Sequence, residues 1–199
     1  SHGDQEKFTK EELIEKFSLD KVGKSAGVFN AEKLLDLNAW YIRQAPDEYL
    51  ARQLTPFLER LGFKDLNETR LKKAVQTLKP RSKTLAEMAE AARFYFEKDI
   101  TYEKKGDDKF LKPEVLDLLE AFRTRLEKTS VFTQAVLEND FVAFLEENEL
   151  KMRQVAQPLR IALTGKTVSP GIFEVMEALG KSKVLERLTQ AVTHIRTKG

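Results

Sequence analysis

The stretch QPLRIALTGKTVSPGIFEVMEALGK, residues 157–181, holds the groups of this sequence best suited to directed hydrogen bonding. The pattern indicates two short helices joined by a polar turn, with Ser169 as the N-cap and Pro170 as the first residue of the second helix. Arg160 precedes the turn, so hydroxyls, free amides and a guanidinium should meet there. Such groups can hydrogen-bond the edges of unstacked nucleic-acid bases. Helix capping alone would produce much of the same pattern, and composition does not separate the two interpretations.

Positive charge clusters at a second place, immediately before another expected helix. Lys79, Arg81 and Lys83 precede a predicted helix start at Thr84. Exposed amides and the positive end of the helix dipole add to these charges, so an anion or a nucleic-acid phosphate would be favoured here. Closely spaced cations are also common on solvated surfaces, which leaves a purely structural interpretation open.

The composition leaves little material for catalysis. The chain has no cysteine and two histidines, which excludes disulfides and thiol chemistry and leaves almost nothing for histidine-based metal or acid–base sites. Asp107 and Asp108 are adjacent, and successive side chains on a helix point in different directions, so they do not converge on one metal ion. The GKS triplet at 23–25 lacks the earlier glycine of a Walker phosphate-binding loop, because Ser18 stands at that position.

Length and charge limit the class of protein. A chain of 199 residues is long enough for one large domain or two small ones, with 41% apolar and 33% charged residues. Its net charge is only +2, so a nucleic-acid partner would have to be bound by local clusters rather than by bulk charge. No apolar run is long enough to span a membrane, and the polar N-terminus lacks a signal-peptide core. These features predict a cytoplasmic protein without a membrane partner.

Helical periodicity dominates the sequence, and strand signals are nearly absent. The aromatic run at 94–96 and the pair Trp40 and Tyr41 could stack on bases, but within amphipathic helices such residues are expected in the core. Gly62 should end one helix. Capping residues and prolines predict helix starts in the first half at Thr9, Asn30, Pro46, Asn67 and Thr84.

The second half begins with a polar interruption. The segment TYEKKGDDKFLKP, residues 101–113, is predicted as a loop at the junction of two subdomains, with Pro113 suited to the first turn of the next helix. The predicted fold class is therefore all-α, an irregular helical bundle or cage in two parts. Further helices are expected at 132–137, 140–147, 151–163, 170–179 and 182–195.

Three separated segments resemble one family, in the expected order. QPLRIALTG, SPGIFEVMEALGK and the later LERL are similar to the C-terminal end of bacterial glutamyl-tRNA synthetases. FTKEELIEKFSLDKVGKSAGVFNAEKLLDLNAWYI resembles the part of those enzymes just beyond their KMSKS-type loop. PRSKTLAEMAEAARFYF resembles their first anticodon-binding subdomain. The resemblance covers the chain from Gly3 onward.

This resemblance implies three parts and a catalytic domain outside the chain. Residues 1–45 would be the remainder of a stem-contacting region, with Ser1 and His2 interpreted as the remnant of an expression tag. Residues 46–106 and 107–199 would be two anticodon-binding subdomains. The family's HIGH-type and KMSKS-type motifs are not in the sequence. The resemblance therefore implies that ATP and magnesium belong to the missing catalytic domain, and that this chain holds no cofactor and is inactive alone.

The family's anticodon contacts match positions in the stretch described first. Gln157 and Arg160 fall where the family contacts anticodon bases. Ser169, Pro170 and Ile172 fall where it reads a base through backbone, hydroxyl and apolar contacts. By resemblance, this turn is the expected anticodon-binding site.

Two upstream residues complete the expected site. Lys83, preceded by Arg81, aligns with a position that is arginine in some members and helps to judge an anticodon base. Arginine is a planar, two-pronged donor and lysine a point charge, so discrimination between glutamate and glutamine tRNAs stays open. The expected partner is the anticodon stem-loop of a glutamate tRNA, bound by a monomer. The alternative is a helical protein-interaction module that binds no RNA.

Overall fold

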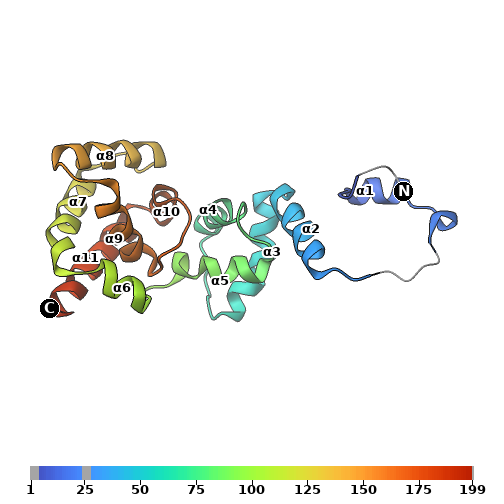
Figure 1. Cartoon of the computed structure of the whole chain (residues 1–199), viewed down its shortest axis with the longest axis horizontal. Coiled ribbons are helices and arrows are strands. Elements are labelled where there is room, and N and C mark those ends of the chain that lie inside the picture. Colours follow the sequence, from blue (N-terminus) through green and yellow to red (C-terminus); the bar gives the residue numbers. More distant parts are fainter. Residues whose placement is uncertain (1–4, 24–27, 199) are drawn as a thin grey trace.

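The computed structural model describes residues 5–23 and 28–198, and every regular element within them is helical (Figure 1). The predicted all-α class is confirmed. Residues 1–2, interpreted as a tag remnant, and residues 24–25 of the GKS triplet lie outside the described part. None of the described helices is long and apolar enough to cross a membrane. The molecule is elongated, with α1 at one end and the helices of the second half at the other.

The N-terminal part contains α1 (Lys10–Lys16) and a short 3-10 turn (Leu19–Lys21). The predicted capping box is confirmed. The Thr9 hydroxyl accepts from the Glu12 amide at 3.2 Å, and the Glu12 carboxylate accepts from the Thr9 amide at 2.6 Å. No residue of α1 is buried, so this helix adds little to the core.

Of the four helices of the first half, α3, α4 and α5 pack against one another. Leu54 and Leu58 of α3 are fully buried. The helix starts predicted from Asn30, Asn67 and Thr84 are confirmed, because each side-chain oxygen accepts a hydrogen bond from an amide of the first turn. The four helices are α2 (Ala31–Gln44), α3 (Asp47–Arg60), α4 (Glu68–Leu78) and α5 (Leu85–Phe96).

The second half forms a larger group in which α11 lies along α7 and α9. Phe122 and Phe141 are fully buried and meet edge to face, with ring centroids 5.3 Å apart. Helix α10 contacts α8, α9 and also α4 of the first half, so one apolar core runs through both halves. The elements are α6 (Lys104–Phe110), a 3-10 turn (Pro113–Val115), α7 (Leu116–Lys128), α8 (Gln134–Glu147), α9 (Met152–Thr164), α10 (Ile172–Leu179) and α11 (Lys181–Lys198).

The loop predicted at 101–113 is wrong, because this segment contains α6. Gly106 is buried and brings α6 against α9, where a Cβ on this glycine would come within 2.5 Å of the Ile161 Cδ1. Packing against α9 holds a helix that its polar composition does not favour. Tertiary contact has overridden local propensity.

The two helices predicted at 132–137 and 140–147 are a single helix, α8. Asp140 does not cap a new helix. Its carboxylate instead accepts a hydrogen bond of 2.6 Å from the Thr129 hydroxyl, which lies just after α7. The aspartate thereby links two helices and leaves the backbone of α8 continuous.

The expected burial of aromatic residues is confirmed for one group and partly wrong for the other. The run at 94–96 packs in or against the core. Trp40 is half-buried, but Tyr41 is 39% exposed. The Tyr41 hydroxyl donates to the Phe8 carbonyl, and this bond keeps the ring at the surface between α2 and the N-terminal part.

Helix α9 ends at Gly165, whose backbone hydrogen-bonds to the segment that connects the two halves. Gly165 has a φ of +72°, and its amide donates to the Ile161 carbonyl at 2.8 Å. Its carbonyl accepts from the Glu103 amide, also at 2.8 Å. A Cβ on this glycine would lie 2.3 Å from the Thr101 carbonyl oxygen. Only glycine therefore permits this close approach.

Replacing Gly165 with alanine should destabilise the protein more than the same change at Gly62. Both glycines have a positive φ, +72° and +91°, which costs an alanine about 1–2 kcal/mol. The space around Gly62 is open, whereas an alanine at 165 collides with backbone and adds about 1–3 kcal/mol. Urea unfolding of both variants measures the difference. Equal losses of unfolding free energy would contradict the close approach at Thr101.

Candidate nucleic-acid interface

The guanidinium of Arg160 on α9 holds the turn that precedes α10. Its Nη1 donates to the Pro170 carbonyl at 2.9 Å, to the Ser169 carbonyl at 3.3 Å and to the Ser169 hydroxyl. The side chain is half-buried. No hydrogen bond within the described residues uses its Nε or Nη2, so these donors remain available to a ligand.

Ser169 is not the N-cap of α10, and Pro170 is not its first residue. The N-cap is Gly171, and the helix begins at Ile172. The Gly171 amide donates to the Glu174 carboxylate at 3.1 Å. The Ser169 hydroxyl donates to the Pro170 carbonyl at 2.8 Å, so it is used within the turn rather than for capping. The N-cap prediction fails because the turn is ordered by side chains from elsewhere in the chain.

Arg81, from the turn after α4, reaches the same place. Its Nη1 donates to the Ser169 carbonyl at 3.1 Å, so guanidinium groups from the two halves converge on one oxygen. Within the described residues, no carboxylate forms an ion pair with either arginine. Burial and the nearby charge of Arg81 lower the pKa of Arg160. An arginine keeps its charge at neutral pH, so the turn carries two positive charges that the protein itself does not neutralise.

Lys83 does not join these arginines. Its Nζ lies 3.4 Å from an oxygen of Asp36 on α2, and both side chains are more than half exposed. Its carbonyl accepts from the Asn38 side chain at 2.5 Å. Lys83 thus lies against α2, although it is two positions from Arg81 in sequence. An exposed pair of this kind contributes little to stability and leaves the ammonium available to a phosphate.

Gln157 lies one turn before Arg160 on α9 and is half-buried. Its side-chain oxygen is buried and has no hydrogen-bond partner within the described residues. A buried acceptor without a partner is unfavourable, and a donor from a ligand would satisfy it. The stretch therefore holds one unpaired acceptor, one helical turn from Arg160 and covered by the protein in this structure.

The apolar residues of the expected site are turned into the core. Pro170 is buried, and Ile172 is 6% exposed. The polar groups near the surface come from Arg81, Arg160 and Ser169. Apolar contact between Ile172 and a base stays a prediction.

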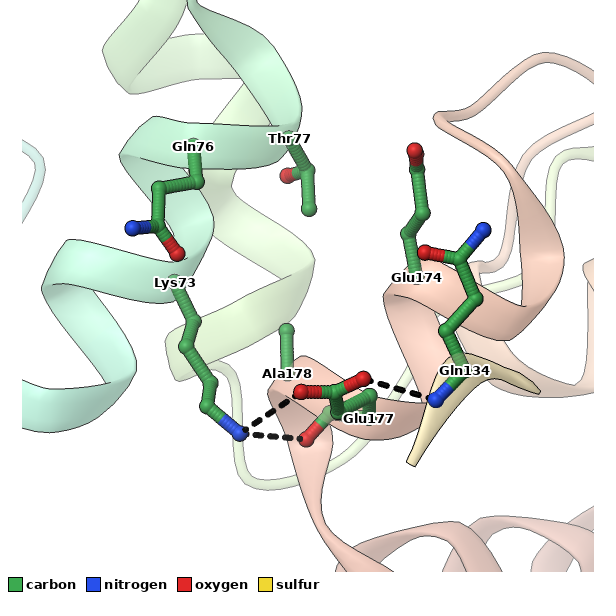
Figure 2. Close-up of a pocket in the computed structure, with 7 residues that line it drawn as sticks. All are labelled: Lys73, Gln76, Thr77, Gln134, Glu174, Glu177 and Ala178. Atoms are coloured by element: carbon green, nitrogen blue, oxygen red, sulfur yellow. Dashed lines mark hydrogen bonds and ion pairs between the residues drawn. The ribbon is translucent and has the colours of Figure 1, made fainter. Parts of the chain in front are cut away.

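A polar cleft of about 160 Å³ lies between α4 and α10 (Figure 2). Lys73 Nζ is 3.5 Å from one carboxylate oxygen of Glu177, and the other oxygen accepts from the Gln134 amide at 2.7 Å. Glu177 therefore caps α8, whose N-cap Thr133 makes no side-chain capping bond. Glu174 adds a second carboxylate to the lining. Two acidic groups make this cleft unsuited to RNA phosphate.

Sequence reasoning missed one buried charge, Arg187 of α11. Its side chain is 0% exposed and donates to the Leu163 and Phe94 carbonyls at 2.6 Å and 2.5 Å. Burial lowers its pKa to about 10, so it remains charged at neutral pH. The available signal was its position in the helix, on the same face as the buried Val184 and Leu188.

The described residues offer little to a metal ion. No group of three or more histidine and acidic side chains in the described part of the chain is arranged to hold one. The site is built instead from guanidinium, amide, hydroxyl and carbonyl groups. Such a set can bind and orient a polar ligand, but it contains no arrangement of nucleophile and base for covalent chemistry.

Relatives of known function agree with the resemblance found in the sequence. A glutamate–tRNA ligase from Geotalea uraniireducens is 49% identical over 196 residues, which is 98% of this chain and 42% of the relative. One from Desulfosudis oleivorans is 47% identical over the same shares of both chains. The chain thus spans 42% of the length of these relatives.

Solved structures show the same fold at lower identity. A glutamate tRNA ligase from Elizabethkingia meningosepticum superposes with a TM-score of 0.82 at 23% identity, over 93% of this chain and 36% of that one. A glutamate–tRNA synthetase from Elizabethkingia anophelis gives 0.76 at 22% identity, over 92% and 36%. Residues 49–192 match the family described as the anticodon binding domain. This match covers most of the chain, so the chain belongs to the anticodon-binding domain family.

Proposed function

We propose that this chain recognises the anticodon loop of a glutamate tRNA, as the anticodon-binding portion of a glutamate–tRNA ligase. The observation that carries the proposal is the convergence of Arg81 and Arg160 on the Ser169 carbonyl, with no ion pair to a carboxylate among the residues that the structure describes. The family match over 49–192 and the names of the relatives support the same partner.

Arg160 would divide its donors between the protein and the RNA. Its Nη1 holds the 169–170 backbone, while Nε and Nη2 have no partner within the described residues. These free donors would bind a base edge or a phosphate oxygen. The buried oxygen of Gln157 would accept from a base amino group. Bases have to be unstacked for their edges to be read in this way, as in most sequence-specific RNA recognition.

The positive side chains around the turn would follow the phosphate path. Lys83 is exposed and pairs only loosely with Asp36, so exchange of that partner for a phosphate costs little. Phosphate contacts of this kind position an RNA, whereas contacts with base edges specify its sequence. The proposed division therefore gives Lys83 a positioning contact and Arg160 with Gln157 the selective ones.

Binding to a glutamate tRNA, with and without its anticodon bases replaced, tests the proposal. If about four phosphates are neutralised, the log–log salt slope is about −3, and affinity falls about sixtyfold between about 50 and 200 mM salt. Base replacement and Arg160→Ala should each weaken binding by about 5- to 150-fold, because one well-placed contact to a base contributes about 1–3 kcal/mol.

Arg123→Ala is the matched control for this experiment. Arg123 lies on α7 and pairs with Glu127 at 2.6 Å, away from the turn at Ser169. The Arg123→Ala substitution should leave the affinity for the tRNA unchanged. Equal binding of the intact and the base-replaced tRNA would overturn anticodon recognition, and absence of binding at the lowest salt would overturn any RNA role.

The whole protein would extend beyond this chain. We infer that it attaches glutamate to tRNA with ATP and magnesium, using a catalytic part that lies outside these 199 residues. The names of the relatives, of which this chain spans 42%, support that activity. We further propose that the chain works as a monomer in the cytoplasm, where tRNA is charged.

We propose a division into three parts, close to residues 1–45, 46–106 and 107–199. The packing of α6 on α9 as a whole helix supports a junction of the last two parts in the segment before α6, a few residues earlier than 107. The first part lies entirely before the family match at 49–192 and exposes large apolar side chains, with Ile14 at 69%. These side chains would pack against another part of a ligase.

Deleting the first 28 residues should therefore leave the rest of the chain folded. Helix α1 buries no residue, and the Lys33–Glu6 pair is more than half exposed at both ends. The melting temperature should change by less than about 2 °C, because a loss of 1 kcal/mol shifts it by about 2–4 °C in a domain of this size. Calorimetry of the shortened and full chains provides the comparison. A drop of about 5 °C or more would show that α1 is an integral part of the core.

A further inference from the structure

The junction between the two halves is organised around the buried guanidinium of Arg187. Its Nη1 donates to the Leu163 carbonyl at 2.6 Å, and its Nη2 donates to the carbonyls of Phe94 and Glu97 at 2.5 Å and 3.0 Å. No carboxylate among the described residues forms an ion pair with it. Being 0% exposed, it is inaccessible to RNA.

The carbonyls that Arg187 binds belong to helix ends. Phe94 and Glu97 lie in the last turn and at the C-cap of α5, and Leu163 lies in the last turn of α9. Carbonyls at these positions have no partner within their own helix and carry the negative end of the helix dipole. One cation on α11 therefore joins the ends of two helices that belong to different halves.

Neighbouring residues of α11 strengthen the same junction. Lys183 donates to the Lys98 carbonyl at 2.7 Å, and Gln190 donates to the Asp99 carboxylate at 3.1 Å. With Arg187 between them, they lie at positions i, i+4 and i+7 and share one face of the helix. This face of α11 receives the C-terminal end of α5 and the segment that follows it.

The residues of this junction lie on the same helices as the residues proposed to bind the anticodon. Arg160 precedes Leu163 by one turn of α9, so fixing the end of α9 fixes the position of Arg160. Arg81 lies in the turn between α4 and α5, at the other end of α5. The Ser169 carbonyl accepts from both arginines only if α5 and α9 keep their relative placement.

We propose that Arg187 is a positioning residue for anticodon recognition, which holds Arg81 and Arg160 at the spacing at which both serve one ligand. This inference rests on the proposed function. It predicts that loss of the junction lowers selectivity for the anticodon, while phosphate contacts made by exposed lysines persist.

Arg187→Met tests the inference in the full chain, because methionine retains length and apolar bulk without donors. The measurements are the dissociation constants for the intact and the base-replaced glutamate tRNA at one salt concentration. If the competent arrangement falls to about a tenth of the molecules, binding of the intact tRNA weakens about tenfold. Binding of the base-replaced tRNA should weaken less than about twofold, so the ratio of its dissociation constant to that of the intact tRNA falls about five- to tenfold.

A purely structural role would give a different result. Partial unfolding reduces the concentration of folded protein and weakens the binding of both tRNAs equally. The ratio of the two dissociation constants would then stay unchanged, and this result would overturn the inference. In the double variant Arg187→Met with Arg160→Ala, the two losses should not add, because both act through the same contact. Full additivity would also count against positioning.

Arg187→Lys keeps the experiment decisive if the methionine variant does not fold. Lysine retains the charge but has one ammonium in place of a fork that reaches three carbonyls, so the ratio should fall in the same direction. An unchanged ratio in a folded lysine variant overturns the inference. If the unaltered chain itself does not distinguish the two tRNAs, the proposed function falls and this inference falls with it.

Discussion

Arg187 carries a buried positive charge that forms no ion pair with a carboxylate in the described chain, and the arrangement of the two halves depends on how that charge is accommodated. Burial of an ion is unfavourable unless its donors find acceptors. The ends of α5 and α9 supply acceptors for both Nη atoms as main-chain carbonyls, whereas the buried Nε has no partner within the described residues. The two helix ends can serve one guanidinium only where they lie side by side. The charge and the helix placement therefore constrain each other.

Arg160 shows how surroundings give the same side chain a different role. Arg187 is fully buried with both Nη atoms engaged, whereas Arg160 is half-buried and engages only Nη1. Arg81 brings a second like charge to the Ser169 carbonyl, and the oxygens that these two arginines bind within the described residues are neutral. An arrangement of this kind is less stable alone than with an anion or a base carbonyl in place. The same physical feature that weakens the free turn thus favours a polar ligand.

The sequence predicted the elements that local chemistry determines. Asn30, Asn67 and Thr84 begin helices because their side chains satisfy amides within three residues of themselves. Where distant residues compete, the predictions failed. Ser169 was expected to cap α10, but its polar groups are taken by Arg160 and Arg81. The segment 101–113 was expected to be a loop, but packing on α9 makes part of it a helix. Neither the arginine contacts nor the packing on α9 can be predicted from the local spacing of residues.

The candidate site could likewise be predicted only in part from the sequence. Family resemblance supplied its residue types, including Arg81, Lys83 and Arg160, but it could not say which of them meet. The structure joins Arg81 to Arg160 across the two halves and turns Lys83 towards α2, although Arg81 and Lys83 are near neighbours in sequence. A site assembled from two halves has a geometry only once the angle between them is set. The packing of α10 on α4 and the helix-end carbonyls around one buried cation together constrain that angle, and no periodicity in the sequence encodes it.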